Sequence, residues 1–473
     1  MKIQLQVPEV VRKISSRVRQ AGGSSLLVGG AVVDAINESE PKDWDIEVFG
    51  LSYDRLCEIF ADLGPKKVGK NFGIVTLSHE FCDGHDIDVN VPRRDNSIGI
   101  GHKDFDVELD PNMTPEEAAR RRDFSINSMA VDLETMELVD PFGGLADLEA
   151  GILRATDPET FVEDPLRALR AMQLLARKAK TIDASTMNII RGMLETFPHL
   201  PPERVFEEFR KLLLKAERPS VGLEFLRESG WIVHFPELHE LIGCEQHPEW
   251  HPEGDVWTHT LEVTDASASI RHRLDSDWVE AFAFGAMLHD VGKPEMTVTP
   301  EMVTNGEFPL ERLFSAHGHD RAGMMPAEKF LRRMTNQKVL IERAVTIVGE
   351  HMQPWGLHSG GAKTPAWKRL HNKIRLDIIG WMSLCDCCGR PDRNIGDPDL
   401  EHDVSDHCFE RFSDFGAEPI KPILLGRHLI TAGHEPGKHF GAALRSAFEA
   451  QIDDESLGVD SLLKIALNQL QGN

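Results

Sequence analysis

The spacing of apolar residues changes character once along this chain, close to Asp157. Before that point, short runs such as SSLLV, DWDIEVF, GIVTLS and HDIDVNV alternate or stay apolar between turn residues, which is typical of strands. Beyond it, PLRALRAMQLLARKAK, RVFEEFRKLLLKA and SVGLEFLRESG place apolar residues at helical spacing, and strand patterns almost disappear. The pattern predicts an α+β fold in which a small mixed β-sheet head precedes all-α domains.

A length of 473 residues exceeds one ordinary domain and indicates three or four modules. We expect boundaries where glycine and proline interrupt the helical or strand patterns, near 142–157, near 225–245 and in the acidic, proline-containing stretch 391–420.

The composition, with 41% hydrophobic and 27% charged residues, is that of an ordinary globular protein. No apolar run approaches the roughly 20 residues that span a bilayer, and the N-terminal segment carries charges throughout. The cysteines are scattered apart from Cys385, Cys387 and Cys388, and a single C-x-x-C is better explained by reduced thiols than by a metal site. We therefore expect a cytoplasmic protein without a membrane partner.

The net charge of −25 argues against nucleic-acid binding by bulk attraction, although it leaves room for a local basic groove. One segment, 167–180, is basic and contains no acid, through Arg167, Arg170, Arg177, Lys178 and Lys180. Composition by itself therefore does not predict an RNA partner.

Two glycines, Gly29 and Gly30, follow a predicted strand and precede a predicted helix, an arrangement that lets backbone N–H groups approach an anion. Asp43 and Asp45 come shortly afterwards and would share one face of a strand, because side chains alternate along it. Two carboxylates on one face can bind two Mg²⁺ ions that hold a triphosphate and activate a hydroxyl for in-line attack. An isolated D-x-D is more often a solvated acidic edge, but the Gly-Gly turn upstream favours the metal site.

The segment GGAVVDAINESEPKDWDIEVFG resembles the signature of the polymerase-beta-type nucleotidyltransferases, in the bacterial branch that contains CCA-adding enzymes and poly(A) polymerases. The family pattern is Gly-Gly-x-Val-Arg-Asp followed by Asp-x-Asp, and this chain has Val33 in place of the arginine. The resemblance implies that Asp43 and Asp45 hold catalytic Mg²⁺. A third carboxylate often lies on a neighbouring strand in that superfamily; Asp88 is the candidate, Asp86 shares its face, and an ordinary exposed acid is the alternative.

The segment RRDFSINS resembles the ribose and triphosphate motif of the same family, Arg-Arg-Asp-x-x-x-Asn-Ala, with serine in place of the alanine. The resemblance implies nucleotide binding by Arg121, Arg122, Asp123 and Asn127. Arginine forks suit phosphate oxygens, and aspartate with asparagine can bond ribose hydroxyls. An ordinary charged helix start, with Asp123 near its N-terminus, is the alternative.

Asp164 and Arg167 lie three residues apart at a predicted helix start, in EDPLR, and therefore share a face. A fixed carboxylate and guanidinium match the amino donor and ring acceptor of cytosine and adenine, and they leave buried groups unpaired against uracil and guanine. The motif resembles the Glu-Asp-x-x-Arg template of CCA-adding enzymes, which implies base selection. A surface ion pair between positions i and i+3 is the simpler alternative.

His259, the adjacent His289 and Asp290, and Asp386 follow one another in the order H…HD…D, which resembles the HD phosphohydrolase superfamily. Two histidines and two aspartates can hold one divalent metal and leave positions open for water. The resemblance implies a divalent metal of unspecified identity and phosphohydrolase activity on esters such as 2′,3′-cyclic ends.

His319 (or His317) and His351 add enough imidazoles for a second ion in this module. A lone histidine on an apolar helix is normally a core residue, but five histidines and two acids in the order of the superfamily favour a metal centre.

The resemblance covers nearly the whole chain and implies a nucleotidyltransferase head (1–150), a helical neck with the base-reading motif (151–228), an HD metal-binding domain (229–400) and a C-terminal helical tail (401–473). It implies template-independent transfer of CMP and AMP from CTP and ATP to the 3′ end of tRNA, with Mg²⁺ at the head. tRNA, ATP and CTP are the expected partners, and the oligomeric state is left open.

Two other functions stay open. The same scaffold can be restricted to CC, A or poly(A) addition: GKNFGIV partly matches the poly(A) polymerase signature, whereas the long stretch Pro92–Arg120 fits the flexible loop of full CCA addition and favours the latter. Alternatively, the chain is a metal-dependent HD phosphohydrolase with an inactive RNA-binding head. Val33 favours that interpretation, and the intact Asp43 and Asp45 oppose it.

Overall fold

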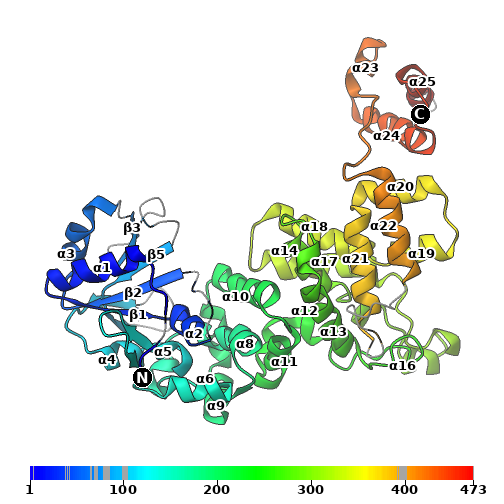
Figure 1. Ribbon diagram of the computed structural model, residues 1–473. Coiled ribbons are helices and arrows are strands. Elements are labelled where there is room, and N and C mark those ends of the chain that lie inside the picture. The colour runs from blue at the N-terminus through cyan, green and yellow to red at the C-terminus, as the bar shows by residue number, and fades with distance from the viewer. Residues whose placement is uncertain are drawn as a thin grey trace. The chain divides into compact units, whose positions relative to one another are not determined.

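The computed structural model describes residues 1–3, 5–37, 39, 41, 43–63, 66–68, 73–77, 82, 86–97, 105–390, 393 and 402–471. The chain divides into two compact units, Met1–Phe235 and Pro236–Asn473, and each is described by itself (Figure 1). Among the described residues, no helix combines the length and the apolar character needed to cross a membrane.

The first unit is built on a seven-stranded mixed sheet. In spatial order its strands are β3 (Lys66–Val68), β4 (Ile74–Leu77), β5 (Asp86–Asn90), β2 (Asp43–Phe49), β1 (Ser24–Val28), β8 (Ala130–Asp132) and β9 (Leu138–Val139). β2 and β5 run parallel, and the other neighbours are antiparallel. The register places Asp45 of β2 opposite Asp88 of β5 on one side and Val28 of β1 on the other.

The two faces of β2 have opposite characters, as the alternation of its side chains requires. Trp44, Ile46 and Val48 are fully buried in the core of the sheet, and each such side chain contributes roughly 1.5–3 kcal/mol on burial. Helix α1 (Glu9–Gln20) adds the apolar stripe of Val11, Ile14 and Val18 to the same core. The acidic residues of β2 are thereby directed to the other face of the sheet.

Helices and two short strand pairs complete the first unit. The helices are α2 (Gly30–Ile36), α3 (Tyr53–Ile59), α4 (Pro115–Arg120), α5 (Ser125–Ser128), α6 (Gly144–Ala150), α7 (Pro158–Phe161), α8 (Leu166–Lys178), α9 (Ala184–Gly192), α10 (Pro202–Lys215) and α11 (Ser220–Ser229). The strand pairs are β6 (Arg93–Ser97) with β7 (Phe105–Leu109), and β10 (Ile152–Leu153) with β11 (Thr181–Ile182). Helix α8 packs on α10 and α11 through a buried apolar face that includes Leu169 and Met172.

The second unit is helical throughout its described part. Its helices are α12 (Pro236–His239), α13 (Val256–Ser269), α14 (Val279–Leu288), α15 (Lys293–Met296), α16 (Pro300–Thr304), α17 (His319–Arg332), α18 (Lys338–Glu350), α19 (Gln353–Ser359), α20 (Thr364–Lys373), α21 (Leu376–Cys387), α22 (Asp403–Phe415), α23 (Gly426–Thr431), α24 (Lys438–Asp453) and α25 (Val459–Gln471). Helix α14 is apolar on all sides and packs against α13, α18 and α21, as expected for a helix enclosed by neighbours.

The α+β fold class predicted from the sequence is confirmed, and so are the strand, turn and helix around Gly29 and Gly30. The stretch Pro92–Arg120, expected to be a flexible loop, contains the β6–β7 hairpin and helix α4. Most of the partial poly(A) polymerase signature GKNFGIV, including its lysine and phenylalanine, lies outside the described residues.

Candidate functional sites

A cleft of about 420 Å³ opens in the first unit where α2, β2 and α8 meet. Gly29, Gly30, Val33, Asn127 and other residues line it. Its charged lining consists of three carboxylates, Asp45, Asp123 and Asp164, and eight basic side chains, Arg122, Arg167, Arg170, Arg177, Lys178, Arg204, Lys211 and Lys215. A chain of net charge −25 thus carries a local excess of positive charge, which suits a polyanion.

The Gly29 turn approaches the acidic strand closely. Gly29 has a positive φ of 74°, and a Cβ atom at this position would lie 3.3 Å from Oδ2 of Asp45 and 3.8 Å from Nη1 of Arg122. Any side chain here would be strained by the backbone conformation and would crowd the carboxylate. Glycine therefore leaves the space beside Asp45 and Arg122 open to a ligand.

Asp43 and Asp45 project from the same face of β2, and Asp88 faces Asp45 across the parallel pair. Burial, Asp88, Asp43 and Glu47 together raise the pKa of Asp45 to about 6, against the lowering effect of Arg122. Oxygen donors that repel one another in this way fit a hard cation such as Mg²⁺.

Asp88 accepts a hydrogen bond of 2.6 Å from the Thr76 hydroxyl. The side chain of Asp86, the other candidate for the third carboxylate, lies outside the described residues. Asp43 is exposed and does not line the cleft. Among the described residues, the sets of three ligand atoms within 4.8 Å of one another all lie in the second unit, so the head carboxylates are spaced more widely.

The four residues of the RRD motif separate into two groups. Arg122 and Asn127 line the cleft, and Arg122 contacts Glu47 at 3.3 Å. Arg121 does not line it, because its guanidinium donates to the carbonyl of Arg93 on β6. The sequence interpretation of Arg121 as a nucleotide ligand therefore stays a prediction without support from its position.

Asp123 is buried, and protein donors already occupy its carboxylate. Oδ1 accepts from the Phe124 backbone at 2.8 Å and from the Asn127 side chain at 3.0 Å, and Oδ2 accepts from Arg170 at 2.6 Å. Although burial acts to raise it, Arg170 and these hydrogen bonds hold the pKa of Asp123 below its usual range. Asp123 thus ties the start of α5 to α8, and a bond to ribose has to compete with Arg170.

Asp164 and Arg167 both line the cleft at the start of α8, but these two described side chains form no ion pair with each other. Oδ1 of Asp164 accepts from the backbone of Leu166 at 3.0 Å. Arg167 donates to the carbonyls of Thr160 and Arg121, each at 2.6 Å, and burial lowers its pKa. Since a guanidinium carries five N–H donors, these two bonds fix its plane and leave other donors for a ligand.

Three further cations of α8 reach the cleft and were not assigned roles from the sequence, apart from their place in a basic run. Arg170 pairs with Asp123, and Lys178 lies 2.6 Å from Asp34 of α2. Arg177 donates to the neutral side chain of Gln173 at 2.6 Å. Positions 167, 170 and 177 recur at helical spacing, which is the signal that could have identified this face.

Val33, the departure from the family pattern, is 1% exposed and packs in the core of the sheet. Neighbouring Asp34 finds its cation in Lys178, which is distant in sequence. The cleft therefore keeps positive charge next to α2 without an arginine at position 33.

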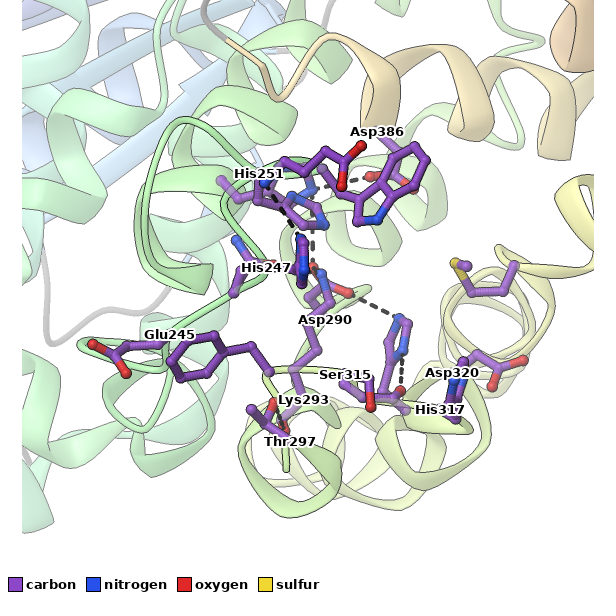
Figure 2. A pocket seen from close by; sticks show the side chains of 18 of the residues that line it. Glu245, His247, His251, Asp290, Lys293, Thr297, Ser315, His317, Asp320 and Asp386 are labelled. Atoms are coloured by element: carbon purple, nitrogen blue, oxygen red, sulfur yellow. Dashed lines mark hydrogen bonds and ion pairs between the residues drawn. The ribbon is translucent and has the colours of Figure 1, made fainter. Parts of the chain in front are cut away.

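A second cavity, of about 850 Å³, lies in the second unit (Figure 2). Five of the six predicted HD residues line it, and the buried His289 is the exception. His259 is in α13, His289 and Asp290 follow α14, and Asp386 is in α21. His319 begins α17, and His351 follows α18. All of them are buried except the partly exposed Asp386.

These six residues form two sets of ligand atoms within 4.8 Å: His259, His289 and Asp386, and Asp290, His319 and His351. Nε2 of His259 lies 2.9 Å from Asp386, and Nε2 of His319 lies 3.0 Å from Nε2 of His351. Asp290 joins the sets, because Oδ1 is 3.1 Å from His319 and Oδ2 is 3.2 Å from His289.

Backbone carbonyls orient three of the imidazoles. Nδ1 of His289, His319 and His351 contacts the carbonyls of Ala286, Ala316 and Val348 at 2.8, 2.8 and 2.7 Å respectively. Each Nε2 is thereby turned toward the cluster, as in histidines that ligate metals. Nε2 of His289 is buried and lacks a hydrogen bond within the described structure, so the donor set fits a divalent metal that favours imidazole.

The surrounding charges also perturb these groups. Burial and the neighbouring His319 and His289 lower the pKa of His351 to about 3, so its imidazole is neutral and able to ligate. Burial opposes ionisation of Asp290, but His289 and Lys293 hold its pKa well below the usual range. The Lys293 ammonium lies 2.6 Å from Asp290.

The structure distinguishes between His319 and His317, the two candidates for the fourth histidine of the centre. His319 belongs to the cluster, whereas His317 is exposed and lines the cavity (Figure 2). His251, Glu253 and Lys293 also lie at this site and were missed from the sequence. The segment HPEWHPEGDVWTHT (247–260) contains three histidines, and a role was predicted only for the last of them, His259.

Comparisons with known proteins agree with this organisation. Three family models match the chain: the poly A polymerase head domain at residues 25–154, the probable RNA and SrmB-binding site of polymerase A at 181–242, and the HD domain at 256–379. The multifunctional CCA protein of Stenotrophomonas maltophilia (strain K279a) is 32% identical over 378 residues, which cover 78% of this chain and 82% of that protein. The multifunctional CCA protein of Vibrio parahaemolyticus is 34% identical over 331 residues, covering 69% and 74% respectively.

Solved structures share the fold. The Bacillus stearothermophilus CCA-adding enzyme in complex with CTP has a TM-score of 0.63 and 18% identity, with 99% of this chain and 100% of that chain covered. The Thermotoga maritima CCA-adding enzyme complexed with tRNA has a TM-score of 0.55 and 18% identity, with 98% and 96% covered. At this identity the likeness is one of fold.

Proposed function

Because the chain belongs to the family of multifunctional CCA proteins, we propose that it transfers CMP and AMP from CTP and ATP to the 3′ end of tRNA without a nucleic-acid template. One observation carries the proposal: Gly29, Asp45 and Arg122 share a cleft with Asp164 and Arg167. This shared cleft supports the proposal, because one nucleotide bound there could contact both the proposed triphosphate site and the proposed base-reading pair.

The proposed roles combine the resemblance to the family with the lining of the cleft. Two Mg²⁺ ions held by Asp43, Asp45 and, as a third ligand, Asp88 would activate the terminal hydroxyl and stabilise the departing pyrophosphate. The Gly29 turn gives phosphate oxygens close access to the backbone, and Arg122 supplies a guanidinium beside it. Asn127 lies where it can bond a ribose hydroxyl.

The base selection that we propose uses protein groups alone. Asp164 offers a carboxylate oxygen to the amino group of cytosine or adenine, and Arg167 offers an N–H to the ring nitrogen. Two backbone carbonyls hold the Arg167 guanidinium in place, so it cannot turn to suit uracil or guanine. Unpaired buried groups then exclude those bases.

The test uses tRNA that lacks one, two or three terminal nucleotides, with each labelled triphosphate supplied singly and together. We expect C, C and A in order, no incorporation of U or G, and termination after A. Extension of all substrates by A alone, or by a long A tail, would instead identify a poly(A) or A-restricted enzyme. If no tRNA substrate is extended, the head is an RNA-binding module without nucleotidyltransferase activity.

We further propose that the second cavity hydrolyses phosphate esters such as 2′,3′-cyclic ends. The two sets of closely spaced ligand atoms support this proposal, and they come from His259, His289, Asp290, His319, His351 and Asp386. A bound divalent metal would supply an activated water and polarise the phosphate. Lys293, Arg390 and Arg393 line the cavity and can attract the anionic ester. Opening of 2′,3′-cyclic AMP to the monophosphate, and release of phosphate from 2′-AMP, each with and without added metal, test the assignment.

A further inference from the structure

Glu253 precedes α13 in the second unit, and its side chain is only 2% exposed. Oε1 lies 2.7 Å from Nδ1 of His259 and 2.8 Å from Nδ1 of His251. The contact with His259 is the less well aligned of the two. Oε2 is buried and lacks a hydrogen bond within the described structure. A buried carboxylate is costly unless it is paired, so the two imidazoles are what stabilise this charge.

The distances distinguish a hydrogen-bonding role from a third metal site. Two donor atoms that ligate one ion at about 2.0–2.2 Å are normally about 3 Å or more apart. The contacts of Glu253 with the imidazoles are shorter than that. The contact with His251 is a hydrogen bond, and the contact with His259 has the length of an N–H···O⁻ bond but not its alignment. His259 also has its other nitrogen engaged, because Nε2 lies 2.9 Å from Asp386. The Nε2 edge of this ring therefore meets Asp386, which is a proposed metal ligand, and the Nδ1 edge meets Glu253.

His259 differs in this respect from the other three histidines of the centre. His289, His319 and His351 have backbone carbonyls at Nδ1, whereas His259 has a carboxylate. A charged acceptor orients an imidazole more strongly than a neutral one and makes its other nitrogen a better metal donor. Gly389 lies close to the same ring: a Cβ atom at this position would be only 2.4 Å from Nδ1 of His259. Any residue larger than glycine at position 389 would therefore displace this ring.

We propose that Glu253 is a positioning residue for the metal centre, which holds the Nδ1 proton of His259 and of His251 and turns both Nε2 atoms toward the cavity. The inference rests on the proposed metal-dependent function of this cavity. His251 lines the cavity and meets His259 edge to face, with ring centroids 4.8 Å apart (Figure 2). Glu253 therefore orients one ring that ligates the metal and one that faces the substrate space.

The test compares Glu253→Gln with Glu249→Gln in the full chain, both in an Asp43→Asn/Asp45→Asn background that removes metal ligands from the head. Glu249 is an exposed residue that lines the same cavity, which makes it a matched control. We expect Co²⁺ affinity, followed by absorption and by calorimetry, to fall about 10–100-fold in Glu253→Gln and to stay unchanged in the control. The melting temperature without metal reports any loss of folding separately.

Co²⁺ binding by Glu253→Gln within about threefold of the control would overturn the inference, because outer ligands of this kind matter by at least tenfold. A second measurement does not depend on any variant. In the wild-type protein loaded with Zn²⁺, ¹⁵N NMR should show the proton of His259 on Nδ1, and a proton on Nε2 would overturn the inference. If the Asp43→Asn/Asp45→Asn background itself binds no Co²⁺, the metal assignment of this cavity is overturned as well, whereas tRNA extension by the head of the wild-type protein would be unaffected.

Discussion

Asp45 lies among other carboxylates, with Asp43 and Glu47 on its own strand and Asp88 on the neighbouring one. Its pKa of about 6 shows that the folded head holds a proton here more tightly than an unfolded chain does. The ionised form of Asp45 is therefore destabilised by burial and by the neighbouring carboxylates, and at neutral pH it costs free energy unless a cation is bound. The destabilised charge of this one residue thus indicates a cation site.

The pH dependence of stability follows from this pKa. A carboxyl whose pKa is raised from 3.8 to about 6 on folding contributes stability that is complete below pH 3.8 and is lost as the pH rises through about 6. The amount is about 3 kcal/mol at most. Without divalent ions, we expect the melting temperature of the head to fall over this range more in the wild type than in Asp45→Asn.

Added Mg²⁺ should reverse this loss above pH 6 and have little effect below it, because protons compete with the ion. Differential scanning fluorimetry across pH with and without Mg²⁺ measures the effect. An equal Mg²⁺ shift at all pH values, or an unchanged pattern in Asp45→Asn, would contradict the assignment of Asp45 as a ligand.

Base choice also belongs to single residues. Replacement Asp164→Asn should reduce the preference for CTP over UTP by about tenfold or more in kcat/KM, because an amide can turn to donate where the carboxylate only accepts. Single-turnover incorporation with each triphosphate measures the ratio. Glu163→Gln, at the preceding residue, is the matched control. An equal preference for CTP over UTP in the two variants would show that Asp164 takes no part in base recognition.

Helix α8 shows how one element serves two purposes. Its apolar face packs on α10 and α11, while Arg167, Arg170, Arg177 and Lys178 reach the cleft. Arg170 is bonded to the buried Asp123 next to α5, and Lys178 is bonded to Asp34 of α2. The helix therefore positions the base-reading residues and also joins them to the nucleotide motif and the glycine turn.

The buried Asp123–Arg170 pair should carry much of that connection. Arg170→Met leaves a buried carboxylate unpaired and should destabilise the first unit by roughly 3–5 kcal/mol. Adding Asp123→Asn removes the charge and should recover a large part of the loss. Urea unfolding of the single and double variants measures both values. Additive effects of the two substitutions would show that the pair is not coupled.

At the scale of the whole molecule, the two candidate sites are built from separate units, and no residue in the described part of the chain lines both cavities. Asp43→Ala/Asp45→Ala should therefore lose nucleotide incorporation and keep phosphatase activity, and His289→Ala should do the reverse. Parallel assays of tRNA extension and of 2′,3′-cyclic AMP hydrolysis on the two variants measure this. Loss of both activities in either folded variant would show that the sites depend on each other.

The sequence by itself determined the features that depend on local spacing. The alternation in DWDIEVF, the glycine turn before α2 and the apolar stripes of α8 and α10 follow from the periods of strand and helix. The residue order H…HD…D predicted the second site through its resemblance to the HD superfamily, and the residue types in it are ones that bind divalent metals. Local patterns thus predicted the α+β architecture, and the family motifs predicted about half of the residues that line the first cavity but only a few of those that line the second.

Tertiary structure decided which distant residues meet. Lys178 and Asp34 are 144 positions apart, and His259 and Asp386 are 127 apart, so no local period relates them. Arg170 and Asp123 are another such pair. The folded chain also decided that His319 and not His317 joins the metal-ligand set, and that Arg121 bonds to β6 and does not reach the cleft. Such partnerships depend on how sheets and helices pack and on which buried charge needs an opposite one nearby, and these are properties of the folded chain.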